Sequence, residues 1–397
     1  MTHVVVVGSG PSGLRTASLA VAGGLRVTLI GAEPGAPYNR VALSTLLAGD
    51  TSHADIFTPP ADSITYRPGV RVIGIERQEK RLRLEDGEPV SYDKLVLATG
   101  STAVRLRLPG ADLPGVLLYR TLNNVQAMLE AAKAGGRAIV IGGGLLGLEA
   151  ASGLARRGMK VTVVHAVSRL MERQLDPGGA SHLAKRLESQ GVSLALNASS
   201  LSIIGGDYAH GVQLSDGRVL EAELVVMAVG IRPASELAAE AGLEIIRGVV
   251  VDDAMRTLDP DIYAVGECAE HRGVVCGLVA PALAQADVVA AGLLGRAATY
   301  TQAEDSTALK VAGAAIWSAG EPMADDADSL VLDDEHLGNY RHLLLRGGRL
   351  VGAVLLGETG DAPWYLRLIR EGADVNALRH ALPFGPSFAQ ILHGPLR

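Results

Sequence analysis

The chain is 397 residues long, with 48% hydrophobic residues, 20% charged residues and a formal net charge of −7. This length allows two or three domains with substantial cores, and the acidic balance argues against a nucleic-acid partner, since nucleic-acid-binding domains usually present a basic surface. Two cysteines, Cys268 and Cys276, are too few for an ordinary iron–sulfur cluster or zinc site and lack the spacing of a redox dithiol, so we expect no metal site.

The first predicted element is an apolar strand that runs into a glycine-rich turn, VVVVGSGPSGL at residues 4–14. An apolar helix and a second strand, LRVTLI from Leu25, complete the β-α-β pattern of the GxGxxG dinucleotide fingerprint. In this fingerprint the first glycine permits a tight turn, the second lets a pyrophosphate approach the backbone, and the third packs the helix against the strand. The candidate nucleotide contacts here are Gly8, Gly10, Pro11, Ser12 and Gly13.

The same pattern returns as AIVIGGGLLGL at residues 138–148, with every glycine shifted by 134 positions. A second strand, MKVTVV from Met159, keeps that offset. A single GxGxxG is weak, but two in register strongly indicate two dinucleotide-binding domains. The corresponding candidate contacts are Gly142, Gly144, Leu145 and Gly147.

Hairpin-like segments follow both units and end in similar apolar strands, KLVLATG at 94–100 and LVVMAVG at 224–230. A further strand, DIYAVGEC at 261–268, indicates that the chain then returns to the first domain. From about Ala303, alternating strands and a helix predict a small α+β domain, and the turn-rich end predicts a partly disordered tail. The expected fold is α/β with two Rossmann-like domains, the second inserted in the first. The expected domains are residues 1–113 with 236–302, residues 114–235, residues 303–380, and a tail at 381–397.

One apolar run, at residues 273–295, is long enough to cross a membrane. It contains Pro281, Gln285 and Asp287, so a buried loop and helix is the better interpretation, and we expect no membrane partner. The start of the chain lacks the basic segment of a signal peptide. We therefore expect a cytoplasmic protein.

The two nucleotide domains, with ATG before the second and YAVGE after it, resemble the FAD-dependent pyridine-nucleotide reductases over nearly the whole chain. The resemblance implies that the first unit binds FAD and the inserted unit binds NAD(P)H. It also implies that Gly266 and Glu267 contact the flavin ribityl chain, where a carboxylate can accept a hydrogen bond from a hydroxyl. The further candidates are Glu33 for the adenosine ribose, Arg40 and Ser44 for a phosphate or the isoalloxazine, Val72 for the adenine, and Ala98, Thr99 and Gly100 near the flavin nucleotide. For Glu33, Arg40 and Ser44 the alternative is an ordinary polar loop residue.

Three candidates remain in the second unit. Glu149 lies on the helix after the glycine turn and is the candidate catalytic residue at the nicotinamide or flavin edge; the alternative is an acid favoured by the helix dipole. Gly230 is a further cofactor contact. His165 ends the second strand, where an aspartate or glutamate would bind the ribose hydroxyls.

The histidine leaves the choice of nucleotide open. A neutral imidazole can hydrogen-bond a hydroxyl, whereas an imidazolium together with Arg169 could meet a 2′-phosphate. The residues thus allow NADH and NADPH, and the resemblance favours NADH. A core or surface histidine with no role toward the cofactor is the alternative.

Branch-specific segments narrow the resemblance. Disulfide reductases need a cysteine pair near the first helix, and peroxide- or oxygen-reducing relatives need one cysteine there, but this chain has none in that region. PYNRVALST at 37–45 resembles the PYxRPPLSK loop of ferredoxin and rubredoxin reductases, but Thr45 replaces the lysine that would pair with the glutamate at the position of Glu149. GGGLLGLEAA, VTVVH…LMERQLD and YAVGECAEHRG, together with the tail segment LKVAGAAIWSAG, most resemble the flavin module of NAD(P)H nitrite reductase large subunits and of assimilatory nitrate reductase electron-transfer subunits.

These observations predict an FAD-dependent NAD(P)H reductase that passes electrons to a separate acceptor in nitrate or nitrite assimilation. Nitrite reduction itself needs sirohaem and cysteine-ligated iron–sulfur centres, so the expected partner is an iron–sulfur, sirohaem or molybdenum enzyme. The alternatives are a ferredoxin or rubredoxin reductase serving a monooxygenase or biosynthetic enzyme, and a flavoprotein that senses NADH. The acidic stretch at 324–336 is a candidate docking surface, although such runs are more often a solvated face.

Overall fold

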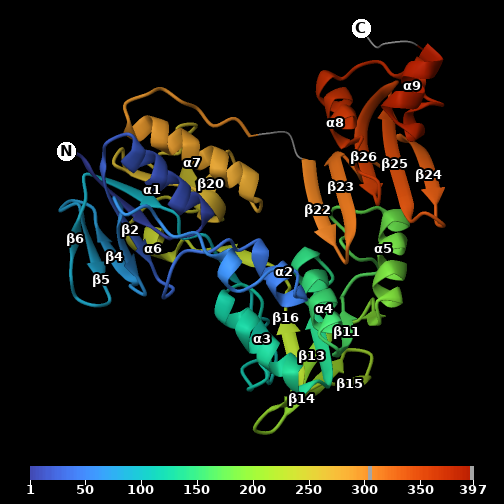
Figure 1. The fold of residues 1–397 in the computed structure, drawn as a ribbon, viewed down its shortest axis with the longest axis horizontal. Helices are drawn as coiled ribbons and strands as arrows, with labels where there is room; N and C mark the ends of the chain where they lie inside the picture. Colours follow the sequence, from blue (N-terminus) through green and yellow to red (C-terminus); the bar gives the residue numbers. More distant parts are fainter. Residues whose placement is uncertain (303–305, 394–397) are drawn as a thin grey trace. The chain divides into compact units, whose positions relative to one another are not determined.

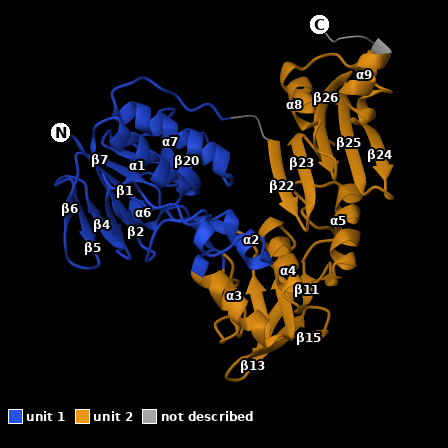
Figure 2. Ribbon diagram, viewed as in Figure 1, with its two compact units in different colours: residues 1–104, 120–122, 231–303 blue, residues 105–119, 123–230, 304–397 orange. Residues whose placement is uncertain are grey.

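The computed structural model describes residues 1–302 and 306–393, which form two compact units (Figure 2). Unit 1 comprises residues 1–104, 120–122 and the described residues from 231 to 302; unit 2 comprises 105–119, 123–230 and 306–393. The predicted domain boundary near Ala303 and residues 394–397 of the predicted tail lie outside the described residues. The finer domain limits expected from the sequence stay a prediction.

Unit 1 is built on a parallel sheet of five strands in the order β19-β7-β1-β2-β3, of which β2 is labelled in Figure 1. The strands are β1 (His3–Val7), β2 (Arg26–Gly31), β3 (Thr65–Pro68), β7 (Lys94–Leu97) and β19 (Ile262–Ala264). Its central strands are almost continuously apolar and buried, as expected for a parallel sheet covered on both faces. Helix α1 (Pro11–Ala22) packs along β1 and β2 and beside α7 (Val279–Leu293).

Smaller elements complete unit 1. An antiparallel meander is formed by β4 (Val72–Glu76), β5 (Arg81–Leu84) and β6 (Val90–Ser91), and a mixed sheet by β18 (Val249–Val251), β20 (Ala269–His271) and β21 (Val274–Val275). A two-stranded antiparallel ribbon pairs β8 (Ser101–Ala103) with β17 (Ile231–Pro233). The short helices are α2 (Ala42–Ala48), η1 (Ala54–Ile56), α6 (Glu236–Glu240) and η2 (Gly266–Cys268).

The first part of unit 2 repeats this architecture. Its parallel sheet has the order β12-β11-β10-β16-β9, from β9 (Val116–Leu118), β10 (Arg137–Ile141), β11 (Lys160–Val164), β12 (Val192–Ala195) and β16 (Leu224–Met227). The register repeats as well, because His3 pairs with Arg26 in unit 1 and Arg137 with Lys160 in unit 2. The remaining elements are α3 (Leu122–Ala134), α4 (Leu145–Arg156), α5 (Pro177–Ser189) and the meander of β13 (Ser200–Gly205), β14 (Ala209–Leu214) and β15 (Val219–Glu221).

The last part of unit 2 is an antiparallel sheet with helices. Its strands lie in the order β22-β23-β26-β25-β24, from β22 (Ser306–Val311), β23 (Ala314–Gly320), β24 (Asp328–Asp334), β25 (Asn339–Arg346) and β26 (Arg349–Leu356). The helices are α8 (Ala362–Glu371), η3 (Asn376–Leu378), η4 (Leu382–Phe384) and α9 (Pro386–His393). Within the stretch predicted as a tail, Leu382 and Ala389 are buried in the same core as Leu343 of β25.

The fold class predicted from the sequence is confirmed: two Rossmann-like parallel sheets, the second between two parts of the first, are followed by an antiparallel α+β module. The long apolar run ends in α7, a helix of 15 residues that includes Pro281 in its first turn. Within the described part of the chain, no helix combines the length and the apolar character needed to cross a membrane.

Candidate functional site

The first glycine turn lies between β1 and α1, and its three glycines differ in how much room surrounds them. A Cβ on Gly8, whose φ is +110°, would collide with the carbonyl oxygen of Ala98, and a Cβ on Gly13 with that of Gly8. A Cβ on Gly10 would meet no atom within 4 Å. Gly10 is the N-cap residue of α1 and offers no side chain to accept from the first N–H groups of the helix. An open backbone approach at a helix N-terminus fits the pyrophosphate of a dinucleotide.

The second glycine turn, between β10 and α4, has the same geometry. A Cβ on Gly142 would collide with the carbonyl oxygen of Ala228, and a Cβ on Gly147 with that of Gly142. Gly144 again has nothing within 4 Å of its Cβ position and caps α4 with no side-chain bond. Each unit therefore contains one cradle that fits a dinucleotide.

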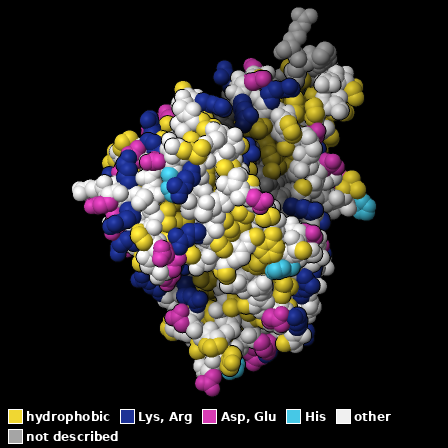
Figure 3. All heavy atoms as spheres, turned by 60° about the vertical axis from the view of Figure 1, so that its left-hand side comes forward, with side chains coloured by type: hydrophobic (Ala, Val, Ile, Leu, Met, Phe, Trp, Pro, Cys, Tyr) yellow, Lys and Arg dark blue, Asp and Glu magenta, His cyan; other side chains and the backbone are white. Residues whose placement is uncertain are grey.

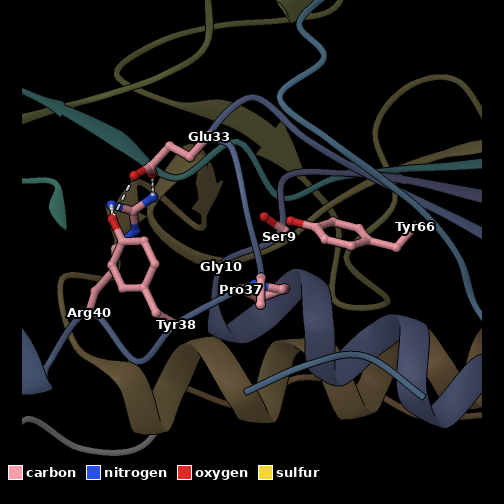
Figure 4. A pocket seen from close by; sticks show the side chains of 8 residues that line it. Ser9, Gly10, Glu33, Pro37, Tyr38, Arg40 and Tyr66 are labelled. Atoms are coloured by element: carbon pink, nitrogen blue, oxygen red, sulfur yellow. Dashed lines mark hydrogen bonds and ion pairs between the residues drawn. The ribbon is translucent and has the colours of Figure 1, made fainter. Parts of the chain in front are cut away.

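A pocket beside Gly10 brings together two predicted contacts, Glu33 and Arg40 (Figure 4). The two side chains form an ion pair, and Tyr38 donates a hydrogen bond of 2.7 Å to Glu33 Oε2. Burial raises the pKa of Tyr38 to about 12, so its hydroxyl stays a donor at neutral pH. Arg40 Nη1 in turn donates to the Tyr38 hydroxyl at 2.9 Å. The arrangement holds a carboxylate beside the glycine turn, where an adenosine ribose would lie.

A second cluster forms at the carboxyl ends of the neighbouring strands β7 and β19. Glu267 accepts a hydrogen bond of 2.8 Å from Ser101 Oγ and forms an ion pair with Arg120. The backbone carbonyl of Arg120 accepts from Arg40 Nη1 at 3.2 Å, which links this cluster to the pocket. The predicted contacts gathered here are Ala98, Thr99, Gly100, Gly266 and Glu267. Sequence reasoning missed Arg120 and Ser101, because neither belongs to a recognisable motif.

The other predicted contacts of unit 1 are less informative. Ser44 lies half-buried in α2, where its hydroxyl donates to the carbonyl oxygen of Val41 at 3.3 Å. Thr45, which stands where related loops have lysine, donates to the carbonyl oxygen of Ala42. Val72 opens β4 with its side chain buried in the core of the unit. Pro11 and Ser12 occupy the first turn of α1.

In unit 2, Leu145 begins α4 and Glu149 lies one turn further along it, half-buried. Gly230 follows β16 with a φ of +127° and open space at its Cβ position. Both residues stay candidates for contact with a nucleotide held at Gly144.

His165 is tied to the second glycine turn. Its Nδ1 accepts a hydrogen bond of 3.1 Å from the backbone N–H of Gly143. Because a backbone N–H can only donate, the imidazole carries its proton on Nε2, which lies 3.2 Å from Glu172 Oε2 and donates to it. The carbonyl of Gly143 accepts from the backbone N–H of Met171 at 3.0 Å. Glu172 was not among the predicted residues, although it lies in the LMERQLD segment.

Neither cysteine lies in surroundings that favour a reactive thiolate. Cys268 is fully buried in η2, and its thiol donates to the carbonyl oxygen of Leu97 at 3.4 Å. Burial raises the pKa of both thiols, that of Cys276 to about 12. Thiolates are the reactive form, so both cysteines are expected to be inert.

Among the described residues, one group with metal-ligand chemistry is found, His182 of α5 with Asp333 and Glu335, whose ligand atoms lie within 4.8 Å of one another. His182 Nε2 lies 2.8 Å from Asp333 Oδ1, and Lys185 pairs with Glu335 at 2.6 Å. These pairs connect α5 with the C-terminal sheet, which accounts for the cluster without an ion.

With this geometry in view, comparisons with known proteins identify the chain. The family model of the pyridine nucleotide-disulphide oxidoreductases matches residues 2–288. The chain belongs to this family. A second model, the C-terminal domain of rubredoxin NAD+ reductases, matches residues 306–373 of this family member. The resemblance drawn from the sequence, to FAD-dependent pyridine-nucleotide reductases, is thereby confirmed.

Among curated relatives, a nitrite reductase [NAD(P)H] of Bacillus subtilis is 42% identical over 94% of this chain but only 48% of its own length. The assimilatory nitrate reductase electron transfer subunit of the same organism is 38% identical over 94% of this chain and 50% of its own length. The chain thus spans about half the length of these relatives. A rubredoxin-NAD(+) reductase of Pseudomonas putida is 35% identical over 74% of this chain and 80% of its own length.

Solved structures agree with the fold. A putidaredoxin reductase, crystallised as a covalent complex with putidaredoxin, gives a TM-score of 0.87 at 26% identity and covers 98% of both chains. A ferredoxin reductase of Rhodopseudomonas palustris gives a TM-score of 0.87 at 28% identity, covering 96% of this chain and 97% of its own. The family therefore includes members that serve separate electron-carrier proteins.

Proposed function

We propose that this chain is an FAD-dependent NAD(P)H oxidoreductase that passes electrons to an acceptor outside its 397 residues. The observation that carries the proposal is the geometry of the two glycine turns. In each turn one glycine, Gly10 or Gly144, is the only one with open space at its Cβ position, and it lies at a helix N-terminus that no side chain caps. Membership of the family supports the same conclusion.

In this proposal unit 1 holds FAD. The N–H groups at the start of α1 bind its pyrophosphate, and Glu33, fixed by Tyr38 and Arg40, accepts from the adenosine ribose. Glu267 lies at the end of β19, within reach of a ribityl hydroxyl, and Arg120 and Ser101 hold its carboxylate in place. Bound FAD would supply the hydride acceptor that no side chain provides.

Unit 2 holds the nicotinamide nucleotide at the start of α4. Gly144 lets the pyrophosphate approach the backbone, and Leu145 lies in the first turn, where its N–H is available to the phosphate. Glu149, one turn further, is the candidate to orient the nicotinamide ring. Orientation of the reacting rings is the main contribution that the protein makes to a hydride transfer.

We further propose an acceptor in nitrate or nitrite assimilation. The support is the 42% and 38% identity to the matched halves of the two Bacillus subtilis proteins. The chain has two cysteines, both unsuited to ligate a cluster, so the iron–sulfur, sirohaem or molybdenum centre would belong to another polypeptide segment. We propose a cytoplasmic location for this reaction, which rests on the proposed acceptor.

The acidic stretch 324–336 gives little support to electrostatic docking of that acceptor. Four of its acids are paired within the protein: Asp326 with Arg346 at 2.5 Å, Asp328 with Arg379 at 2.9 Å, and Asp333 and Glu335 with residues of α5. On the face shown in Figure 3, basic and acidic side chains are interspersed rather than gathered by sign. The stretch is better explained as a set of structural ion pairs.

A rubredoxin or ferredoxin reductase is the second candidate, favoured by the match of residues 306–373 to the C-terminal domain of rubredoxin NAD+ reductases. The decisive experiment mixes the FAD-loaded chain with NADH under anaerobic conditions and follows the bleaching of its visible absorption. Purified nitrite reductase haem protein, rubredoxin and ferredoxin are then added separately. Fast reduction of the nitrite reductase haem protein supports an acceptor in nitrate or nitrite assimilation. Fast reduction of rubredoxin or ferredoxin supports a rubredoxin or ferredoxin reductase. Bleaching with slow transfer to every acceptor would indicate an NADH sensor, and a chain that binds no flavin would overturn all three.

A further inference from the structure

The nicotinamide-nucleotide unit lacks an acid at the end of β11. In dinucleotide-binding folds, a carboxylate about 20 residues after the glycine turn accepts hydrogen bonds from the ribose 2′-hydroxyl and disfavours a 2′-phosphate. Here His165 occupies that place, and both of its ring nitrogens are engaged, Nδ1 by the N–H of Gly143 and Nε2 by Glu172. The imidazole therefore has no nitrogen left for a ribose hydroxyl.

Glu172 brings a carboxylate to the same place from seven residues further along the chain. Its Oε2 lies 3.2 Å from His165 Nε2, while Oε1 has no hydrogen-bond partner within the described residues. The side chain is 41% exposed, so the second oxygen can reach a ligand. A carboxylate has lone pairs on both oxygens and can accept from His165 and from a hydroxyl together.

The loop that carries Glu172 is fastened to the glycine turn. Gly143 donates its N–H to His165 and accepts through its carbonyl from Met171, the residue before Glu172. Met171 adopts a φ of +49°, which few side chains tolerate, and its own side chain is buried. A Cβ on Gly143 would also crowd the His165 ring, at 2.6 Å from Cγ. The carboxylate is thus held in a fixed position beside the phosphate cradle.

Arg169 is a positive charge near Glu172 and would favour a 2′-phosphate if it faced the ligand. Arg169 lies in the same loop, and its Nη2 donates to the backbone carbonyl oxygen of Glu172 at 3.2 Å. Its Nε is buried and has no partner within the described residues. The guanidinium therefore contacts the backbone of the loop and Met323 Sδ, at 4.0 Å, rather than the Glu172 carboxylate, and no arginine or lysine among the described residues forms an ion pair with that carboxylate.

We propose that Glu172, positioned by His165, is the acid that binds the adenosine ribose of the nicotinamide nucleotide and makes the protein selective for NADH over NADPH. This inference rests on the proposed function, since it needs a nucleotide at Gly144. The Glu172 carboxylate lies where the fingerprint acid would lie in the folded protein, although Glu172 is not at the fingerprint position in the sequence. A 2′-phosphate would face the Glu172 carboxylate and is repelled, whereas a 2′-hydroxyl gains a hydrogen bond to a charged group.

The test is equilibrium binding of NAD+ and NADP+ to the FAD-loaded chain, measured by calorimetry without turnover. The unaltered protein should bind NAD+ at least about tenfold more tightly, the difference expected for one hydrogen bond to a charged group. In Glu172→Gln that preference should fall about tenfold, through weaker NAD+ binding and stronger NADP+ binding. Glu188→Gln is the matched control, because it removes the same charge from an exposed position on α5 of the same unit.

His165→Ala tests the positioning role. The preference for NAD+ should fall while bound FAD is retained, whereas a histidine that serves only the fold would weaken both nucleotides by the same factor. Equal binding of NAD+ and NADP+ by the unaltered protein, or an equal change for both in Glu172→Gln, would overturn the inference. Loss of NADP+ binding in Arg169→Gln, with tight NADP+ binding before the change, would assign the site to a 2′-phosphate instead. If neither nucleotide binds the unaltered protein, the proposed function itself fails.

Discussion

The substitution Gly144→Ala separates an effect on the nucleotide site from an effect on the fold. Gly144 has a φ of −86° and a ψ of −178°, which alanine adopts without strain, and its Cβ would meet no protein atom within 4 Å. Replacing a glycine at such a position stabilises a protein by about 0.4–1 kcal/mol, because the unfolded chain loses conformational freedom. Thermal stability should therefore stay the same or rise slightly.

The affinity of Gly144→Ala for the nicotinamide nucleotide should fall, although its stability does not. The added methyl group occupies the space through which a pyrophosphate would approach the N–H groups of α4. Loss of one hydrogen bond to a charged phosphate costs about 1.5–3 kcal/mol, which corresponds to roughly 10- to 150-fold weaker binding. The assay is calorimetric titration with NAD+, together with the FAD content and the Tm of each variant.

Two further variants serve as controls, one at an open glycine outside the turn and one at a crowded glycine within it. Gly206→Ala, at an open position in the turn between β13 and β14, should leave NAD+ binding unchanged and should not lower stability. Gly147→Ala should destabilise the protein, because its Cβ would collide with the backbone carbonyl of Gly142. Unchanged NAD+ affinity in Gly144→Ala, or a loss of stability there, would refute the assignment of the open glycine to the phosphate.

Three other results are expected. Arg40→Ala removes the cation of the pocket in Figure 4 and should lower FAD retention on dialysis by about tenfold; retention equal to that of the unaltered chain would contradict this role. Asp176→Asn should lower stability by about 1–2 kcal/mol, because Asp176 caps α5 and accepts from Tyr340 at 2.6 Å. Burial alone would raise the pKa of Asp176, but the His342 imidazole, whose Nδ1 lies 3.4 Å from Asp176 Oδ2, and the hydrogen bond from Tyr340 outweigh it and hold the pKa below its usual value. The stabilisation is thus present above about pH 4 and lost as the pH falls further, so denaturant titrations at pH 7 and pH 3 should differ more for the unaltered chain than for the variant. Cys276, with its pKa raised to about 12, should resist iodoacetamide at neutral pH until denaturant is added, and rapid labelling of the native protein would show an exposed thiolate instead.

Repeats and glycine spacing made most of the fold predictable. The two GxGxxG turns mark where a strand ends and a helix begins, and the shared offset carries over to the strand register, since His3 and Arg137 occupy equivalent pairs. The short apolar runs before the glycine turns indicated central strands of covered sheets, because a sheet with one exposed face would alternate apolar and polar residues.

The side chains around the cradles were only partly predictable. Glu33 and Gly10 follow the fingerprint, but Arg120 reaches Glu267 from 147 positions away, and spacing carries no information about such a contact. Glu172 was missed for a different reason. The expected acid was sought at one position of the linear pattern, whereas a loop fastened to Gly143 brings a carboxylate there from seven residues further on.

The ribbon of β8 and β17 has a consequence for how such a chain assembles. β7 and β19 are neighbours in the sheet of unit 1, yet well over a hundred residues separate them along the chain. Closing so long a loop is entropically costly and slow. Ala103 and Ile231 are paired in the ribbon, so the intervening polypeptide leaves and re-enters unit 1 at adjacent points. Once that polypeptide has folded, the connection that β19 must close is reduced mainly to the segment between β17 and β19, and a whole domain can occupy the chain between β8 and β17 without opening the sheet of unit 1.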